Sequence, residues 1–187
     1  LIILSVVLLT FIFYIVVSLA ISAFNHPFNL IIHQIIPALA AGCSVIVKPA
    51  EDTPLSCKKI IQMLYKSGLP NNRCLFVMPE NLELAGKLVS DKRIDFLSFI
   101  GSAKVGWMLR SKLSAGARCA LEHGGMAPTF LTETTKLEDA SKLISKGGFY
   151  HAGQVCVSVQ RVFVHKNIFK KFIGIFENDL KKLKIGD

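Results

Sequence analysis

The sequence predicts an α/β fold in which helices flank a parallel sheet. Two observations support this prediction. Strand-like and helix-like stretches alternate along the chain after Ala23, which is typical of consecutive βαβ units. The strand-like stretches are short continuous apolar runs, as expected for strands buried on both faces of a parallel sheet. The predicted architecture is therefore Rossmann-like.

The first elements follow from apolar patterning and from stop signals. The stretch Phe13–Ile21 is rich in Ile and Val and suits a strand covered on both faces. A helix is predicted from Pro27 to Ala41 because apolar residues recur there at helical spacing, and Gly42 is a good helix stop. The β-branched run Cys43–Val47 then predicts a second strand.

The next helix begins at Thr53-Pro54, because threonine is a favoured N-cap and proline suits the first helical position. That helix is predicted to run to Ser67-Gly68. The alternation then continues with a strand at Cys74–Met78, a helix at Leu82–Val89, a strand at Ile94–Ile100, a helix within Gly101–Leu113 and a strand at Arg118–Glu122.

The pattern changes at Gly124-Gly125, which marks a predicted crossing between domains. Beyond it, a helix-like stretch leads into Gly147–His165, whose later residues alternate like a strand. Between the two lies the short turn Gly153–Cys156, which holds a single cysteine. An amphipathic helix is predicted just before Lys184.

Composition excludes several classes of protein. The chain is 51% hydrophobic and 19% charged, unlike a disordered segment. The net charge of +9 comes from small lysine groups, without the long basic run of a nucleic-acid footprint, so no nucleic-acid partner is expected. The five cysteines show no metal-ligand spacing, so no metal is expected. Their odd number favours a reducing compartment, and we expect a cytoplasmic location.

The uncharged segment 1–20 allows two interpretations. It is about long enough to span a bilayer, so membrane attachment through residues 1–20 is one hypothesis. The other is a buried strand, because its end is rich in Ile and Val. No basic region precedes the segment, which argues against a secretory signal.

One glycine-bearing turn could meet a phosphate group. Gly101–Gly106 leaves a predicted strand and enters a predicted helix, where backbone N–H groups and the helix N-terminus attract anions. The Gly-x-Gly-x-x-Gly pattern of many dinucleotide sites is missing from it. Taken alone, the turn favours a tight strand-to-helix connection over a phosphate site.

Five motifs together carry a family resemblance. They are FNHP at Phe24–Pro27, VKPAE at Val47–Glu51, FIGSAKVG at Phe99–Gly106, LEHGG at Leu121–Gly125 and GQVC at Gly153–Cys156. In this order and at these intervals, the set resembles the NAD(P)-dependent aldehyde dehydrogenase superfamily from about Ile21 to Asp187. The resemblance implies oxidation of a small-molecule aldehyde to a carboxylic acid, with NAD as the cofactor and NADP as the alternative.

The resemblance implies three catalytic residues. Cys156 matches the family's nucleophile, and a thiolate suits attack on a carbonyl carbon. Asn25 matches an asparagine that donates to the oxyanion. Glu122 matches the general base that activates water for thioester hydrolysis.

The resemblance also implies cofactor contacts. Lys48 and Glu51 match the pair that holds the adenosine ribose, and a carboxylate there favours NAD because it repels a 2′-phosphate. Gly101 and Ser102 match the turn near the pyrophosphate and nicotinamide half. Val105 is expected against the adenine.

Four departures from the family pattern are visible. Ile100 stands where threonine is usual, Met126 where lysine is common, and His123 where an aliphatic residue is usual. The segment Pro79–Ala85 lacks the glycine-rich turn often found there, and only Gly86 remains. None of these positions is one of the three predicted catalytic residues.

The chain is shorter than a full-length family member, and we expect it to be part of one. The predicted organisation is a hydrophobic segment at 1–20, a partial dinucleotide-binding domain at 21–122 and the start of the α/β catalytic domain at 123–187. The full-length form is expected to be a homo-oligomer. Alternative hypotheses are a catalytically incompetent fragment that retains the fold, and a membrane-attached protein.

Overall fold

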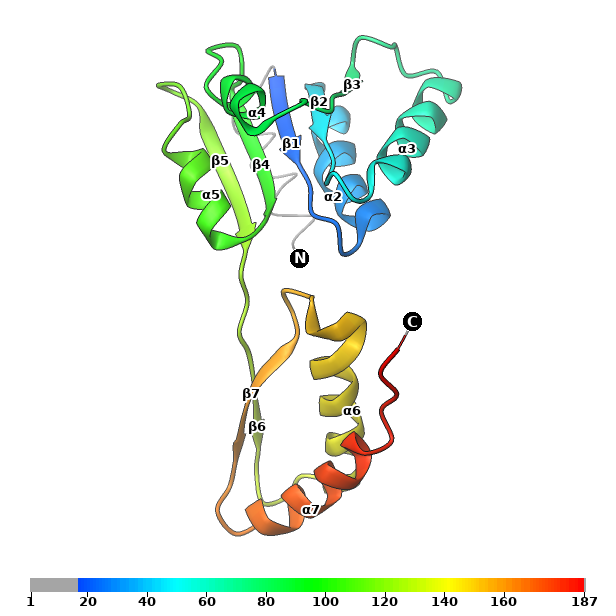
Figure 1. Cartoon of the computed structure of the whole chain (residues 1–187), viewed down its shortest axis with the longest axis vertical. Helices are drawn as coiled ribbons and strands as arrows, with labels where there is room; N and C mark the ends of the chain where they lie inside the picture. The colour runs from blue at the N-terminus through cyan, green and yellow to red at the C-terminus, as the bar shows by residue number, and fades with distance from the viewer. Residues whose placement is uncertain (1–16, 187) are drawn as a thin grey trace. The chain divides into compact units, whose positions relative to one another are not determined.

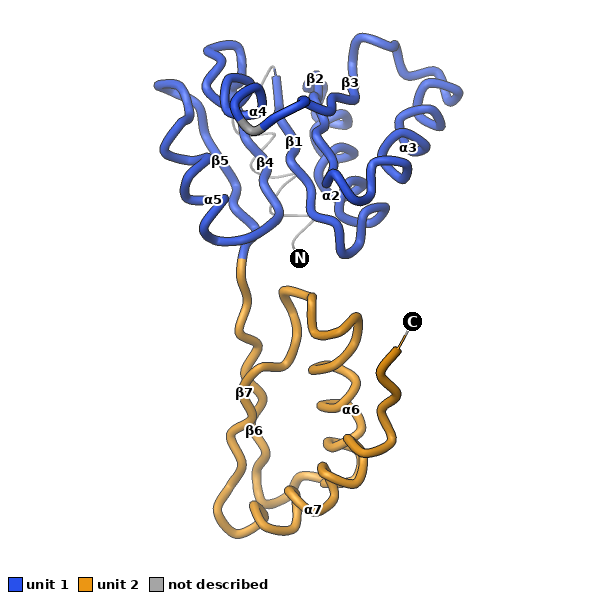
Figure 2. Tube along the Cα trace, viewed as in Figure 1, with its two compact units in different colours: residues 1–123 blue, residues 124–187 orange. Residues whose placement is uncertain are grey.

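The computed structural model describes residues 17–186. The chain divides into two units, one ending at His123 and one beginning at Gly124 (Figure 2).

A five-stranded parallel sheet forms the first unit (Figure 1). Its strands lie in the order β3-β2-β1-β4-β5 and are β1 (Val17–Ile21), β2 (Ser44–Lys48), β3 (Cys74–Phe76), β4 (Phe96–Gly101) and β5 (Arg118–His123). The connecting helices are α2 (Pro27–Ala40), α3 (Pro54–Lys66), α4 (Leu82–Val89) and α5 (Ala103–Arg110). This arrangement confirms the predicted parallel α/β fold.

Two hydrophobic clusters cover opposite faces of this sheet. Successive residues of a strand point to opposite faces of the sheet. In β1, Ala20 belongs to the cluster that includes α2 and α3, and its neighbour Leu19 belongs to the cluster on the opposite face. The second cluster takes in Val89 of α4 and Leu109 of α5. Both Ala20 and Leu19 are fully buried, which explains why β1 reads as a continuous apolar run.

The strand order places a topological switch between β1 and β4. From β1 the chain winds through β2 to β3 on one side, and then crosses to β4 and β5 on the other. In open parallel sheets a ligand crevice forms at such a point, outside the carboxyl ends of the strands.

Several element boundaries differ from the sequence prediction. The fourth strand begins at Phe96 rather than at Ile94, because the Ile94 N–H donates to the Asp91 carbonyl oxygen (3.0 Å) in the turn that precedes the strand. The last helix of the unit starts at Ala103, after Ser102, and ends at Arg110. Thr53 stands at the predicted N-cap of α3, but its hydroxyl makes no capping hydrogen bond.

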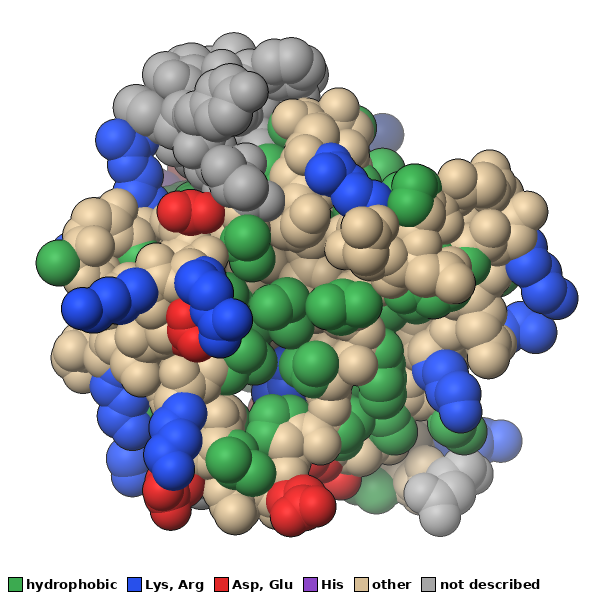
Figure 3. Space-filling view, turned by 90° about the horizontal axis from the view of Figure 1, so that it is seen from above, with side chains coloured by type: hydrophobic (Ala, Val, Ile, Leu, Met, Phe, Trp, Pro, Cys, Tyr) green, Lys and Arg blue, Asp and Glu red, His purple; other side chains and the backbone are tan. Residues whose placement is uncertain are grey.

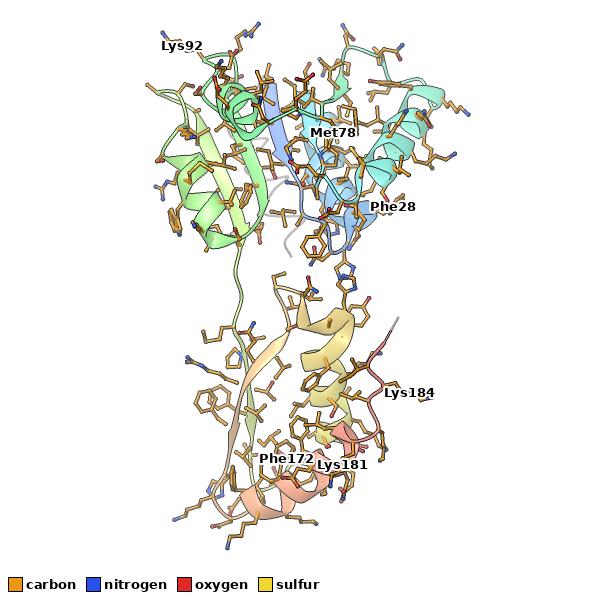
Figure 4. All side chains as sticks on the ribbon, viewed as in Figure 1. Phe28, Met78, Lys92, Phe172, Lys181 and Lys184 are labelled. Carbon is orange, nitrogen blue, oxygen red and sulfur yellow. The ribbon has the colours of Figure 1, made fainter. Side chains whose placement is uncertain are left out.

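The second unit is a βαβ unit followed by one helix. Strands β6 (Ala127–Leu131) and β7 (Val159–Val164) pair in parallel, and α6 (Leu137–Phe149) connects them through the short segment η1 (Tyr150–Gly153). Helix α7 (Phe169–Leu180) completes the unit. Phe172 of α7 lies in its core and is only 2% exposed, whereas Lys184 beyond the helix is exposed (Figure 4).

The membrane hypothesis concerns residues 1–20, of which 1–16 lie outside the described residues. Residues 17–20 belong to the buried strand β1. Among residues 17–186, no helix is both long enough and apolar enough to cross a bilayer. Lysine and arginine side chains are spread singly over the face shown in Figure 3.

Candidate active site

Six of the predicted site residues lie at the carboxyl edge of the five-stranded sheet. Asn25 follows the end of β1, and Lys48 and Glu51 lie at and just after the end of β2. Gly101 ends β4, Ser102 is the N-cap of α5, and Glu122 is the penultimate residue of β5. The strands are parallel and adjacent at the switch point, so the residues that follow them share one edge of the sheet.

Lys48 and Glu51 form an ion pair at this edge. The distance between Lys48 Nζ and Glu51 Oε1 is 3.5 Å, and Lys48 Nζ also donates to the Pro49 carbonyl oxygen at 3.2 Å. The Lys48 side chain is 13% exposed, but the Glu51 side chain is 68% exposed. The pair therefore combines a fixed ammonium group with an accessible carboxylate that can accept from hydroxyl groups.

The turn from β4 into α5 presents a helix N-terminus at the same edge. Ser102 is the N-cap of α5, and its Oγ accepts from Val105 N at 3.4 Å. The first N–H groups of a helix lack intrahelical partners and attract anions. Val105 itself is 39% exposed in the first turn of α5. These groups fit one phosphate-bearing half of a dinucleotide.

Close packing holds α5 against the sheet. A Cβ atom on Gly106 would lie 2.6 Å from His123 Cδ2 and 3.1 Å from the Phe99 ring, so only glycine fits there without a shift. His123 also contacts Trp107 edge-on, with ring centroids 5.3 Å apart. The histidine that replaces the usual aliphatic residue thus packs against α5, while its neighbour Glu122 is exposed.

Cys156 lies in the second unit, in the turn between η1 and β7, and is exposed. Ser158 closes this turn: it is 2% exposed, its Oγ donates to the Gly153 carbonyl oxygen at 3.1 Å, and its N–H donates to Val155 O at 3.0 Å. The exposed thiol of Cys156 therefore lies on a turn that the buried side chain of Ser158 stabilises.

The backbone around Cys156 is tightly constrained. A Cβ atom on Gly125 would lie 1.8 Å from the carbonyl oxygen of Cys156, so the two main-chain segments are in direct contact. Just before the turn, His151 and Ala152 adopt left-handed φ angles of 52° and 54°. Such conformations cost non-glycine residues about 1–2 kcal/mol each and recur near functional sites.

The predicted catalytic residues are distributed over both units. Asn25 and Glu122 belong to the first unit and Cys156 to the second, so their convergence on one cleft stays a prediction. Sequence reasoning missed two polar residues that support these segments, Gln34 and Ser158. A signal for Gln34 was available, because it interrupts the apolar i, i+3, i+4 face of its helix. No local signal distinguished Ser158.

Comparisons with known proteins show what the chain is similar to. Residues 15–187 match the model of the "Aldehyde dehydrogenase family". A 3-sulfolactaldehyde dehydrogenase of Priestia aryabhattai is 40% identical over 169 residues, which cover 90% of this chain and 35% of that protein. The chain thus spans about a third of the length of the curated relatives that it matches.

Solved structures share the fold at similar coverage. Succinate-semialdehyde dehydrogenase from Burkholderia pseudomallei superposes with a TM-score of 0.86 at 32% identity, covering 92% of this chain and 36% of that one. Betaine aldehyde dehydrogenase from Staphylococcus aureus in complex with NAD+ gives a TM-score of 0.86 at 30% identity, covering 91% and 34%.

Proposed function

The chain belongs to the aldehyde dehydrogenase family, and from this premise we propose that it contributes the dinucleotide edge and the nucleophilic cysteine of an enzyme that oxidises an aldehyde to a carboxylic acid. One observation carries the proposal. The carboxyl edge of the sheet gathers an amide, a Lys–Glu pair, a helix N-terminus and a second carboxylate, all on residues that match the family's motifs.

The thiol of Cys156 starts the proposed reaction. Its thiolate attacks the aldehyde carbon, a C–S bond forms, and the carbonyl electron pair moves onto oxygen. The side-chain amide of Asn25 donates to that oxyanion together with the backbone N–H of Cys156. A donor of this kind contributes about 3 kcal/mol in the transition state.

Glu122 acts in the second half of the reaction. A nicotinamide, when bound, would supply the hydride acceptor that the conversion of the thiohemiacetal on Cys156 to a thioester requires. Glu122 then takes a proton from water, the hydroxide attacks the thioester carbon, and the C–S bond breaks. The products are a carboxylic acid and the regenerated thiolate.

The residues of the edge fit a dinucleotide by their donor and acceptor chemistry. The exposed carboxylate of Glu51 accepts from ribose hydroxyls, and the nearby Lys48 ammonium group fixes its position. Gly101, Ser102 and the N-terminus of α5 would hold a phosphate group through backbone N–H donors, and the exposed Val105 would supply an apolar contact to the adenine. An exposed carboxylate disfavours a 2′-phosphate, so we propose NAD rather than NADP.

The test is the change Cys156→Ala in a full-length enzyme that carries these residues. Loss of the nucleophile removes the covalent intermediate, so aldehyde-dependent NADH formation should fall to background while NAD binding, measured by calorimetry, is retained. Cys119→Ala is the matched control, because Cys119 is a half-buried thiol on β5. Normal turnover in Cys156→Ala would end the proposal.

A further inference from the structure

Helix α2 buries an amide on its apolar face. Its buried positions are Ile31, Gln34, Ile35, Pro37 and Ala38, so one glutamine stands among aliphatic side chains. Gln34 is only 4% exposed, and its Oε1 has no hydrogen-bond partner among the described residues. An apolar residue would avoid the cost of a buried unpaired acceptor, so packing alone does not account for this residue.

The amide nitrogen of Gln34 bridges β1, the central strand of the sheet, and its neighbour β4. Nε2 lies 3.2 Å from the Ile21 carbonyl oxygen in β1, and 2.9 Å and 3.1 Å from the carbonyl oxygen and Oγ of Ser98 in β4. An NH2 group has two hydrogens, so it can donate to one atom on each strand at the same time. These hydrogen bonds join segments 13 and 64 residues away in the sequence.

The bridge lies at the switch point, where the two strands lead to site residues. Ile21 is the last residue of β1, four positions before Asn25, and Ser98 lies three positions before Gly101. The ladder between β1 and β4 ends at the pair Ile21–Phe99, so the bridge lies at its last rungs. Ile21 also ends the pairing of β1 with β2, and a donor from α2 that holds both carbonyl groups strengthens the end of the ladder at this point.

We propose that Gln34 is a positioning residue that holds the ends of β1 and β4 in register, and through them sets the Asn25 loop and the Gly101–Ser102 turn. Its link to catalysis rests on the proposed function. The bridge itself does not, because it is a property of the backbone of the first unit.

Amide hydrogen exchange of the purified chain tests the bridge directly. Gln34→Met has nearly the same length and volume but cannot donate. We expect exchange to become about tenfold faster within residues 22–25 and 99–102, because two hydrogen bonds that hold these segments are lost. Gln62→Met, at an exposed position on the neighbouring helix α3, is the matched control and should leave both segments unchanged.

A uniform rise in exchange across the first unit would overturn the proposal, because it would mean that Gln34 contributes only to global stability. An unchanged rate in both segments would also overturn it. Gln34→Asn is a second variant for the case in which Gln34→Met does not fold. Asparagine keeps the amide, but its side chain is one methylene group shorter and cannot reach both strands. This variant should show the same faster exchange within residues 22–25 and 99–102.

A kinetic measurement tests the catalytic part separately. In a full-length enzyme that carries these residues, Gln34→Met should lower kcat about tenfold, since the oxyanion donor is displaced, with a smaller change in the KM for aldehyde. An unchanged kcat would refute the link to Asn25. An inactive wild-type enzyme would refute the proposed function, while the exchange experiment would still decide whether the bridge exists.

Discussion

Cys156 differs from the buried cysteines of the chain in its surroundings. Cys43, Cys57 and Cys74 are buried in one core cluster of the first unit, whereas Cys156 is exposed on a turn of the second. Burial raises the pKa of the Cys57 thiol to about 12 and that of Cys74 to about 11, which keeps both protonated and unreactive near neutral pH. The accessible position of Cys156 agrees with the nucleophilic role proposed for it.

The close contact between Gly125 and Cys156 gives a prediction at this scale. In Gly125→Ala the new methyl group would overlap the Cys156 carbonyl oxygen, so the turn must move. We expect the free energy of unfolding of the second unit to fall by about 1–3 kcal/mol. The alkylation rate of Cys156 should change as well, and denaturant unfolding and iodoacetamide labelling measure the two effects.

The matched control is Gly174→Ala, in the interior of α7, where an added Cβ meets no atom within 4 Å. That change should be neutral or raise the free energy of unfolding by up to about 1 kcal/mol, because alanine is the better helix former. Equal behaviour of the two variants would contradict the contact between Gly125 and the Cys156 turn.

At the scale of elements, one carboxylate links the two helices of the second unit. Asp179 of α7 accepts from Lys182 Nζ at 2.7 Å and from Ser141 Oγ of α6 at 2.6 Å. These two hydrogen bonds, the one from Lys182 first, hold the pKa of Asp179 below its usual value. Because Ser141 is buried, the bond fixes α7 against α6 as well as stabilising the charge.

This lowered pKa predicts acid sensitivity. The stabilisation is complete above the unfolded-state pKa of about 3.9 and is lost as the pH falls through the lower folded-state value. Unfolding of the second unit, followed by circular dichroism below about pH 4, should therefore depend less on pH in Asp179→Asn than in the wild type. Glu177→Gln, at an exposed position on the same helix, is the control. If both variants lost the same amount of pH dependence, the role given to Asp179 would be contradicted.

The buried thiols predict the opposite behaviour in the first unit. Their raised pKa values mean that the folded state keeps protons that the unfolded chain loses, so stability is complete below about pH 8.5 and falls as the pH rises further. Each thiol contributes a slope of up to about 1.4 kcal/mol per pH unit. In urea titrations, the free energy of unfolding should fall less steeply above about pH 8.5 in Cys57→Ala than in the wild type. Cys156→Ala should leave this pH dependence unchanged.

At the scale of the whole molecule, the proposed cofactor site predicts stabilisation by ligand. If NAD+ binds the folded chain alone, a concentration of 100 times Kd should raise the free energy of unfolding by about 2.7 kcal/mol. Glu51→Gln should weaken this effect because it removes the carboxylate that accepts from ribose. Glu138→Gln, an exposed position on α6, should not.

A thermal shift that persists at full size in Glu51→Gln would place NAD+ elsewhere on the chain. The absence of any shift in the wild type would remove the cofactor site of the proposal. The measurement needs no aldehyde, so it separates cofactor binding from turnover.

Sequence patterning predicted much of the fold because its signals are local. Leu82–Val89 was predicted as a helix with the bounds that it has, and Arg118–Glu122 lies within β5. Strand ends were less accurate: Ile94 is apolar and buried but precedes β4, because its N–H donates to the Asp91 carbonyl oxygen in a turn. Apolar character alone does not distinguish a buried residue of such a turn from the strand that follows it.

In the candidate site, too, some features could be predicted from local sequence signals and others depend on the tertiary structure. Motif order predicted Asn25, Glu122 and Cys156 as catalytic residues, and the strand–helix alternation predicted the parallel sheet that places Asn25 and Glu122 at one edge. These conclusions need only side-chain chemistry and the periodicity of helix and strand. The tertiary structure alone decided that the Gln34 amide joins β1 to β4, since a hydrogen bond across 64 residues depends on where the folded helix lies. It alone also decided that Gly125 contacts Cys156, because that contact depends on main-chain geometry rather than on residue type.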